Sequence, residues 1–298
     1  MAAPANQIDT KAINFALDQE FVANYKQEYD RLAEIMGLFG VETKAAGSAL
    51  YQLKIEGSLN NAKTDDSSSG TAYVEGDLVA LSKYTAKKVP MGDITAVPYR
   101  KQTTAAAIQK SGYDVAVLRT DRKMLAHVRA AEIAKFFAFL ANGTGTAEGA
   151  TLQATLANVD ATLADTLEQN DDNGGTLLHF MNRQDAAAYL GAAEITTQTV
   201  YGMTYLQNFL GVERVFLSAK VPAGTVYATT AENVHVYGLD FSELSRGGLS
   251  YATQSDGLVG VAHTPAYDHV STDTNVLCGS MLFPEVQDYI VKGSINPK

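Results

Sequence analysis

The longest helical pattern of apolar and polar positions covers residues 120–141. Its apolar residues recur every three to five positions, as on one broad helix face: Leu125, Val128, Ile133, Phe136, Phe137 and Leu140. Thr120 is a good N-cap residue at the start of this helix. The Asn142-Gly143 pair after its last residue predicts a left-handed stop, with Gly143 as the C-terminal cap. We therefore expect one long helix whose apolar face packs on a sheet.

Two other segments show the same helical period. Residues 10–36 form one stripe, made of Ile13, Leu17, Phe21, Tyr25, Tyr29, Leu32 and Met36. Residues 152–167 form another, made of Leu152, Leu156, Val159, Leu163 and Leu167. Shorter helices are predicted at residues 113–119, 183–193 and 203–210.

Residues 48–56 change to a period of two. Tyr51, Leu53 and Ile55 alternate with polar residues, which predicts a half-buried strand, and a second strand is expected at residues 79–84. Some twenty polar and glycine-rich residues separate the two strands, with Asp65 and Asp66 near the expected tip. This pattern predicts a long β-hairpin that projects from the body and is stabilised by lying on another molecule.

The remaining chain alternates strands with helices. Residues 85–109 are expected to be extended, and further strands are predicted at residues 176–181 and near Val215, Val226 and Val234. Three more strand-like runs, at residues 258–261, 276–283 and 286–295, are expected to return to the sheet beneath the long helix. The whole pattern indicates an α+β fold.

Composition limits the class of protein. The 298 residues are 46% hydrophobic, which is enough for a substantial core, and no apolar run reaches membrane-spanning length. The N-terminus lacks the layout of a secretion signal, so we expect a cytoplasmic protein. One cysteine, Cys278, excludes an internal disulfide framework, and it is expected to be a buried strand residue.

The net charge of −10 argues against a protein whose main task is to grip nucleic acid. Basic residues do gather between positions 83 and 123, where a solvated or salt-bridged surface is favoured over a nucleic-acid contact. This set comprises Lys83, Lys87, Lys88, Arg100, Lys101, Lys110, Arg119, Arg122 and Lys123.

No catalytic motif stands out. Gly143-Thr144-Gly145 lacks the strand and the lysine of a phosphate loop, and the acidic run at residues 171–175 lacks the calcium-ligand spacing, so it is interpreted as a turn. Four residues have zinc-ligand chemistry and lie near each other in the sequence: His263, Asp268, His269 and Asp273. Ordinary surface pairs explain them better, and we expect no metal, no cofactor and no enzymatic activity.

The predicted elements therefore offer more interaction surface than chemistry, which favours a symmetric assembly of identical copies. The residues expected to contact neighbouring copies lie on the arm helix and the hairpin: Phe21, Tyr25, Tyr29, Tyr51, Leu53, Ile55, Asp65, Asp66, Val79, Leu81 and Lys83.

The order of these elements resembles that of the major capsid proteins of tailed bacteriophages with the Hong Kong 97-like fold. The residues that carry the resemblance are Val74-Glu75-Gly76-Asp77, Leu81-Ser82-Lys83, the run YRKQTTAAAIQKSGYDVAVLRTDRKML at residues 99–125 and LANGTG at the helix end. They are similar to the form found in siphophages of Gram-positive hosts. The resemblance implies an N-terminal arm and helix (1–47), an extended loop (48–86), a peripheral domain with its spine helix (87–150 and 251–298) and an axial domain (151–250).

The resemblance also implies function and partners. We expect hexamers and pentamers in an icosahedral virion shell, assembled in the host cytoplasm, with weak non-specific contact to packaged double-stranded DNA. A separate scaffolding protein and a portal are expected partners, with no membrane. Some relatives join subunits through lysine–asparagine bonds, but nothing here pairs Lys54, Lys63 or Lys83 in that way, so no covalent link is predicted.

Three alternatives stay open. The first is a nanocompartment shell of the same fold, enclosing an enzyme. The second is a metal-dependent hydrolase that uses His263, Asp268 and His269. The third is a tail or adaptor protein, which would form rings or tubes in place of closed particles.

Overall fold

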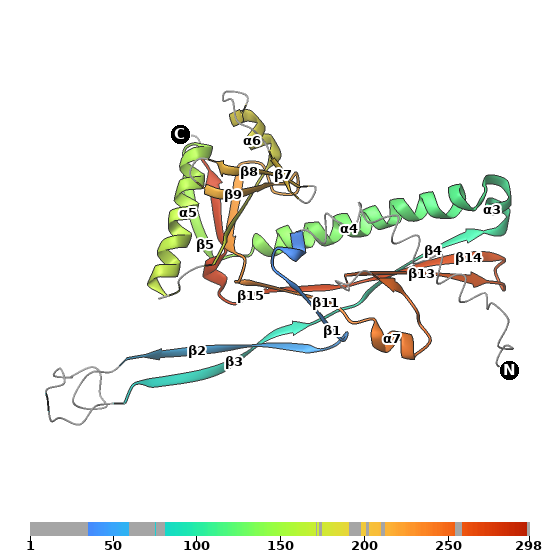
Figure 1. Ribbon diagram of the computed structural model, residues 1–298, viewed down its shortest axis with the longest axis horizontal. Helices are drawn as coiled ribbons and strands as arrows, with labels where there is room; N and C mark the ends of the chain where they lie inside the picture. Colours follow the sequence, from blue (N-terminus) through green and yellow to red (C-terminus); the bar gives the residue numbers. More distant parts are fainter. Residues whose placement is uncertain are drawn as a thin grey trace. The chain divides into compact units, whose positions relative to one another are not determined.

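The computed structural model describes residues 35–59, 75, 81–170, 172, 175–190, 198–200, 203–209, 212–253 and 258–296 (Figure 1). The chain divides into two compact units. The smaller unit is Ser48–Asp93, and the larger unit combines Met1–Gly47 with Ile94–Lys298. The smaller unit is thus an insertion between two segments of the larger one.

Helix α4, Arg119–Leu140, lies along a four-stranded antiparallel sheet in the larger unit (Figure 1). The strand order is β12 (Ala252–Thr253), β13 (Val259–Ala266), β14 (Ser271–Cys278) and β4 (Val97–Thr104). Leu125, Val128, Phe136, Phe137 and Leu140 of α4 are buried in one cluster with apolar residues of these strands. The predicted long helix and its apolar face are therefore confirmed.

A three-stranded sheet continues from the end of β14. It contains β1 (Val41–Lys44), β11 (Val234–Leu239) and β15 (Ser280–Pro284), with β1 parallel and β15 antiparallel to β11. Residues Val234 and Val236 join the cluster beneath α4, together with Ile35 and Met36. The rest of the predicted N-terminal helix, including Phe21, Tyr25 and Tyr29, lies outside the described residues.

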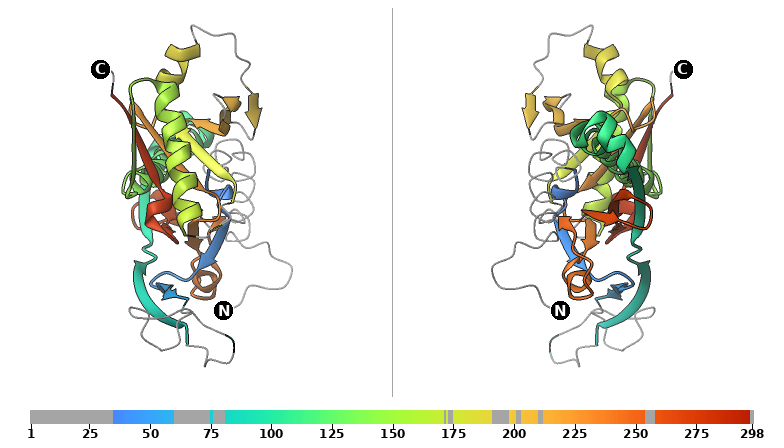
Figure 2. Two further views of the ribbon diagram at one scale, coloured as in Figure 1. Left: turned by 90° about the vertical axis from the view of Figure 1, so that its left-hand side faces the viewer. Right: turned by 90° about the vertical axis from the view of Figure 1, so that its right-hand side faces the viewer.

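A seven-stranded mixed sheet forms the other part of the larger unit. Its order is β5 (Gly145–Gly149), β16 (Val291–Ile295), β10 (Thr225–Thr230), β6 (Leu177–Met181), β9 (Val212–Leu217), β8 (Met203–Phe209) and β7 (Gln198–Val200). Helix α5, Leu152–Gln169, covers one face of this sheet (Figure 2). Its five predicted stripe residues, Leu152, Leu156, Val159, Leu163 and Leu167, are all buried.

Aromatic side chains join the seven-stranded sheet to the end of α4. The ring of Phe180 in β6 packs edge-on against Phe136 and Phe137, with centroid distances of 5.5 and 5.9 Å. The same ring stacks on Phe216 of β9 at 5.5 Å. Helix α4 is therefore shared by both cores, which is why one long helix can organise several sheets.

Short helices complete the larger unit. They are α3 (Ala105–Ser111), the π-helical turn η1 (Asp114–Leu118), α6 (Arg183–Leu190), α7 (Ser242–Arg246) and the 3-10 turn η2 (Gln287–Tyr289). Residues 105–109 were expected to be extended, and that prediction is wrong because Thr104 caps a helix there: its Oγ1 accepts from the amide of Ala107 at 3.3 Å. No helix in the described ranges is both long and apolar enough to span a membrane.

Two other predictions of secondary structure are wrong. Residues 203–209 form strand β8, and not a helix, because they pair between β7 and β9. Strand β16 does not return to the sheet beneath α4: it pairs with β10 and β5 in the seven-stranded sheet. Tertiary pairing overrides local periodicity in both segments.

The predicted caps of α4 are also wrong. Thr120 is not an N-cap, because η1 runs into α4 without a break and the Thr120 hydroxyl lies 2.8 Å from the carbonyl oxygen of Val117. Gly143 is not a left-handed stop: α4 ends at Leu140 with a right-handed residue, Ala141, as its cap. Glycine is needed at position 143 because an added Cβ would lie 2.3 Å from the carbonyl oxygen of Ile290.

The smaller unit is a two-stranded antiparallel hairpin. Strand β2 is Ala49–Ser58 and β3 is Lys83–Asp93, with a register shift between Leu50 and Tyr51. A hairpin was predicted here, but β3 continues nine residues beyond Tyr84. Asp65 and Asp66, which were expected near its tip, lie outside the described residues, as does Val79, where the second strand was expected to begin.

Candidate subunit interface

Large apolar side chains are exposed on the hairpin. Tyr51 is 51% exposed, Tyr84 57% and Leu81 77%. A soluble monomer seldom leaves several such groups in water on a two-stranded ribbon, since a hairpin alone is marginally stable. The hairpin is therefore the candidate surface for contact with another molecule.

Local contacts hold two of these aromatic rings in place. The ammonium of Lys88 lies 3.8 Å from the ring centroid of Tyr51, a close cation–π contact between neighbouring strands. The ring of Tyr84 lies over Gly57, where an added Cβ would be 2.3 Å from the ring. Both rings are thus positioned while much of their surface stays exposed.

The structure places the predicted contact residues unequally. Tyr51, Leu53 and Ile55 occupy alternate positions of β2, as expected, while Leu81 and Lys83 are exposed just before and at the start of β3. Tyr84 and Lys88 were not predicted as contact residues. Tyr84 was the last residue of the predicted second strand, and Lys88 lay beyond the end of that prediction, although β3 continues through it.

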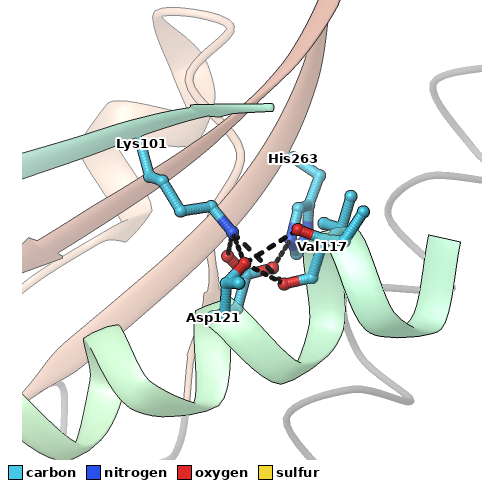
Figure 3. A network of polar contacts seen from close by, with 6 residues as sticks. Lys101, Val117, Asp121 and His263 are labelled. Carbon is cyan, nitrogen blue, oxygen red and sulfur yellow. Dashed lines mark hydrogen bonds and ion pairs between the residues drawn. The ribbon is translucent and has the colours of Figure 1, made fainter. Parts of the chain in front are cut away.

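A buried ionic network fastens the start of α4 to the four-stranded sheet (Figure 3). Asp121 of α4 is fully buried, and its carboxylate forms an ion pair with the ammonium of Lys101 in β4. The Nε2 atom of His263 in β13 lies 2.9 Å from the other carboxylate oxygen. A buried carboxylate is stable only with such partners, so the network fixes how α4 meets the sheet.

Lys101 also supports the π-helical turn. Its ammonium donates to the carbonyl oxygen of Val117 at 3.2 Å (Figure 3). It also donates to the hydroxyl of Thr120. A π-helical turn departs from the regular helical hydrogen-bond pattern, so side chains are needed to satisfy its carbonyl groups. Thr120 thus has a structural role, although not the predicted one.

Part of the basic cluster is salt-bridged, as the sequence indicated. Besides Lys101, Arg100 of β4 forms an ion pair with Asp273 of β14, whose side chain is buried. Lys83, Lys87 and Lys88 are exposed on β3. Some of the basic residues therefore pair with buried acids, and others are exposed on the hairpin.

A second buried acid lies further along α4. Glu132 accepts a hydrogen bond from the hydroxyl of Ser280 at 2.5 Å, and the sulfur of Cys278 lies 3.7 Å from its other oxygen. Burial, reinforced by the Glu132 carboxylate, raises the pKa of the Cys278 thiol to about 12. Cys278 is buried in β14, as expected.

The four candidate zinc ligands have other partners. His263 is bound to Asp121, and Asp273 to Arg100. Asp268 and His269 form an exposed pair at 3.4 Å in the turn after β13. Within the described residues, no group of three or more histidine, cysteine or acidic side chains is arranged to hold a metal ion.

Sequence comparison does not place the chain in a family: no family model and no curated protein matches it. Similarity appears in three dimensions. The capsid protein of an empty GTA particle has a TM-score of 0.57 at 11% identity, over 88% of this chain and 90% of the other. The capsid protein of cyanophage P-SCSP1u has a TM-score of 0.54 at 10% identity, over 86% of each chain.

A shell protein of another kind is equally similar. The holo-SrpI encapsulin complex from Synechococcus elongatus PCC 7942 has a TM-score of 0.56 at 11% identity, over 99% of this chain and 91% of the other. The chain has the Hong Kong 97-like fold. The similarity to these shells lies in the fold, since only about a tenth of the residues are identical.

Proposed function

We propose that this protein is the major capsid protein of a tailed bacteriophage and assembles, as hexamers and pentamers, into an icosahedral shell around the phage genome. The observation that carries the proposal is the Hong Kong 97-like fold, matched over most of the chain by capsid proteins. The exposed hairpin supports it, because a separate unit with Tyr51 and Tyr84 in water needs a partner.

Burial of apolar surface holds such a shell together. Permanent interfaces commonly bury more than about 2,000 Å², whereas an exposed salt bridge contributes about 0 to 1 kcal/mol. The hairpin and the arm helix, with Phe21, Tyr25 and Tyr29, would supply the apolar contacts. The net charge of −10 suits a container that must not bind its DNA tightly.

Further parts of the proposal concern partners and organisation. The protein acts as a structural component and not as an enzyme, works with a separate scaffolding protein and a portal, and resides in the virion after assembly in the host cytoplasm. Residues 48–86 would form the extended loop, 151–250 the axial domain, and 87–150 with 251–298 the peripheral domain. No covalent link between subunits is proposed.

Electron microscopy of the purified protein tests the proposal. We expect closed particles in negative stain and a fast-sedimenting species, both in the protein expressed alone and with its scaffolding protein. Rings or tubes would favour a tail or adaptor protein. A protein that stays a monomer at every concentration, with and without scaffold, would contradict the proposal.

The encapsulin match, over 99% of this chain, is the observation behind a second candidate: a shell that encloses a protein. The content of particles purified from the native source separates the two. Nuclease-protected double-stranded DNA is expected for a capsid, whereas a co-purifying enzyme without DNA is expected for a nanocompartment.

A further inference from the structure

The two faces of the hairpin differ in chemistry. Strand alternation places Tyr84, Ala86, Lys88 and Pro90 on one side of β3, and Lys83, Thr85, Lys87 and Val89 on the other. In the pairing of β2 with β3, Tyr51 lies opposite Pro90 and Gly57 lies opposite Tyr84. Residues that lie opposite each other in an antiparallel pair share a face, so Tyr51 and Gly57 also belong to the first side. We call the first side the tyrosine face and the second side the lysine face.

We propose that the tyrosine face is the side of the hairpin on which a second copy of this chain lies, while the lysine face remains in water. The inference rests on the proposed function and adds to it which side of the hairpin makes the contact. It also separates Tyr51 from Lys83, which the sequence had placed in one contact set.

Burial favours the tyrosine face. Tyr51 and Tyr84 each expose more than half of their surface, and each ring is already positioned, by Lys88 and by Gly57 respectively. Ordered aromatic rings lose little conformational freedom on binding, so covering them is favourable. The neighbouring Ala86 and Pro90 add apolar surface without adding charge.

The lysine face is unsuited to burial. Lys83 and Lys87 are both exposed on it, and covering this face would remove two ammonium groups from water. This face is therefore stable when it is solvated.

Charge identifies a second copy as a suitable occupant. Among the residues assigned to the tyrosine face, Lys88 is the charged one and none is acidic, whereas the whole chain has a net charge of −10. The ammonium of Lys88, held over Tyr51, lies on the tyrosine face, where it can meet acidic groups of that copy.

A matched pair of substitutions at adjacent positions tests the assignment. Tyr84→Asp and Thr85→Asp add the same charge at exposed sites on opposite faces. We expect Tyr84→Asp to reduce particle yield in sucrose-gradient sedimentation at least tenfold, and Thr85→Asp to assemble within twofold of the wild type. Circular dichroism of the subunits confirms that both variants are folded.

Lys88→Gln and Lys87→Gln form a second pair, milder and also one position apart, for use if an aspartate variant misfolds. Lys88→Gln is expected to raise the protein concentration needed for assembly several-fold, and Lys87→Gln to leave it unchanged. Three outcomes would overturn the face assignment and leave the proposed function intact. Assembly is lost only in the lysine-face variants, it is lost equally in the two members of each pair, or it is lost in no variant. A wild-type protein that never assembles would contradict both the face assignment and the proposed function.

Discussion

The Nε2 atom of His263 lies 2.9 Å from Oδ2 of Asp121, a residue 142 positions away in the chain. This contact joins β13 to the first turns of α4. Lys101 of β4, the edge strand of the same sheet, forms an ion pair with the same carboxylate. Three segments distant in sequence therefore meet at one carboxylate. Substitutions at that carboxylate should affect the whole larger unit.

Asp121→Asn should destabilise the subunit by about 3 kcal/mol, because the amide leaves the Lys101 ammonium without its counter-charge. Urea denaturation of the unassembled subunit, followed by circular dichroism, measures the loss. Asp114→Asn is the matched control: Asp114 is exposed and 3.7 Å from Arg119, so a change within about 0.5 kcal/mol is expected. Equal losses for the two variants would contradict a structural role for the network.

Glu132 and Ser280 should be energetically coupled. Glu132→Ala removes the acceptor of the Ser280 hydroxyl and leaves a small cavity, for an expected loss of about 2 kcal/mol. Ser280→Ala should cost about 1 kcal/mol. The double variant should lose about 1 kcal/mol less than the two single losses together, since both remove one interaction. Strict additivity in a double-mutant cycle would show that the hydrogen bond contributes nothing.

Gly143→Ala should destabilise the protein by about 1 to 3 kcal/mol, because the new methyl group meets the carbonyl oxygen and side chain of Ile290. Asn142→Ala, in the same turn and exposed, should change stability by less than about 0.5 kcal/mol. Thermal unfolding of the two variants gives the comparison. If Gly143→Ala unfolds at the wild-type temperature, the contact is not tight.

The thiol of Cys278 should be nearly inert in the folded protein. With its pKa raised to about 12, the thiolate fraction at pH 8 is about 10⁻⁴. Labelling by a maleimide should therefore be at least a hundredfold slower in native than in denatured protein. Comparable rates would show that β14 opens readily.

The same raised pKa sets a direction for stability in alkali. The unfolded thiol ionises near its ordinary value of 9.0 while the folded thiol stays protonated. The unfolded chain then binds fewer protons than the folded one, so stability decreases as the pH rises from 9 towards 12. Cys278→Ala should show a shallower decrease across that range.

Periodicity predicted the elements whose packing depends on one apolar face. The stripes of α4 and α5 were identified because each helix lies on a sheet with that face inward. Strand β8 was mistaken for a helix because Met203, Leu206 and Leu210 lie three and four positions apart, and its pairing with β7 and β9 is invisible to a local pattern.

Contacts between distant residues were the least predictable. Asp121 follows the predicted N-cap residue Thr120 in the sequence, and nothing local connects it with His263 or Lys101. Lys88 was missed as a contact residue because the second hairpin strand was ended at Tyr84, and Tyr84 itself was not selected although it lay in that predicted strand. The rule that buried charges are paired could anticipate a partner for Asp121, but not which residue it is.

The position of β16 has a consequence for synthesis. Strand β5 at residues 145–149 pairs with β16 at residues 291–295, and β16 also separates β5 from β10. On the ribosome, β5 and the helix that follows it must wait until residues 291–295 have emerged before their sheet can close. A truncated translation product would leave that sheet open, so a chain interrupted upstream of β16 is expected to be recognised as misfolded.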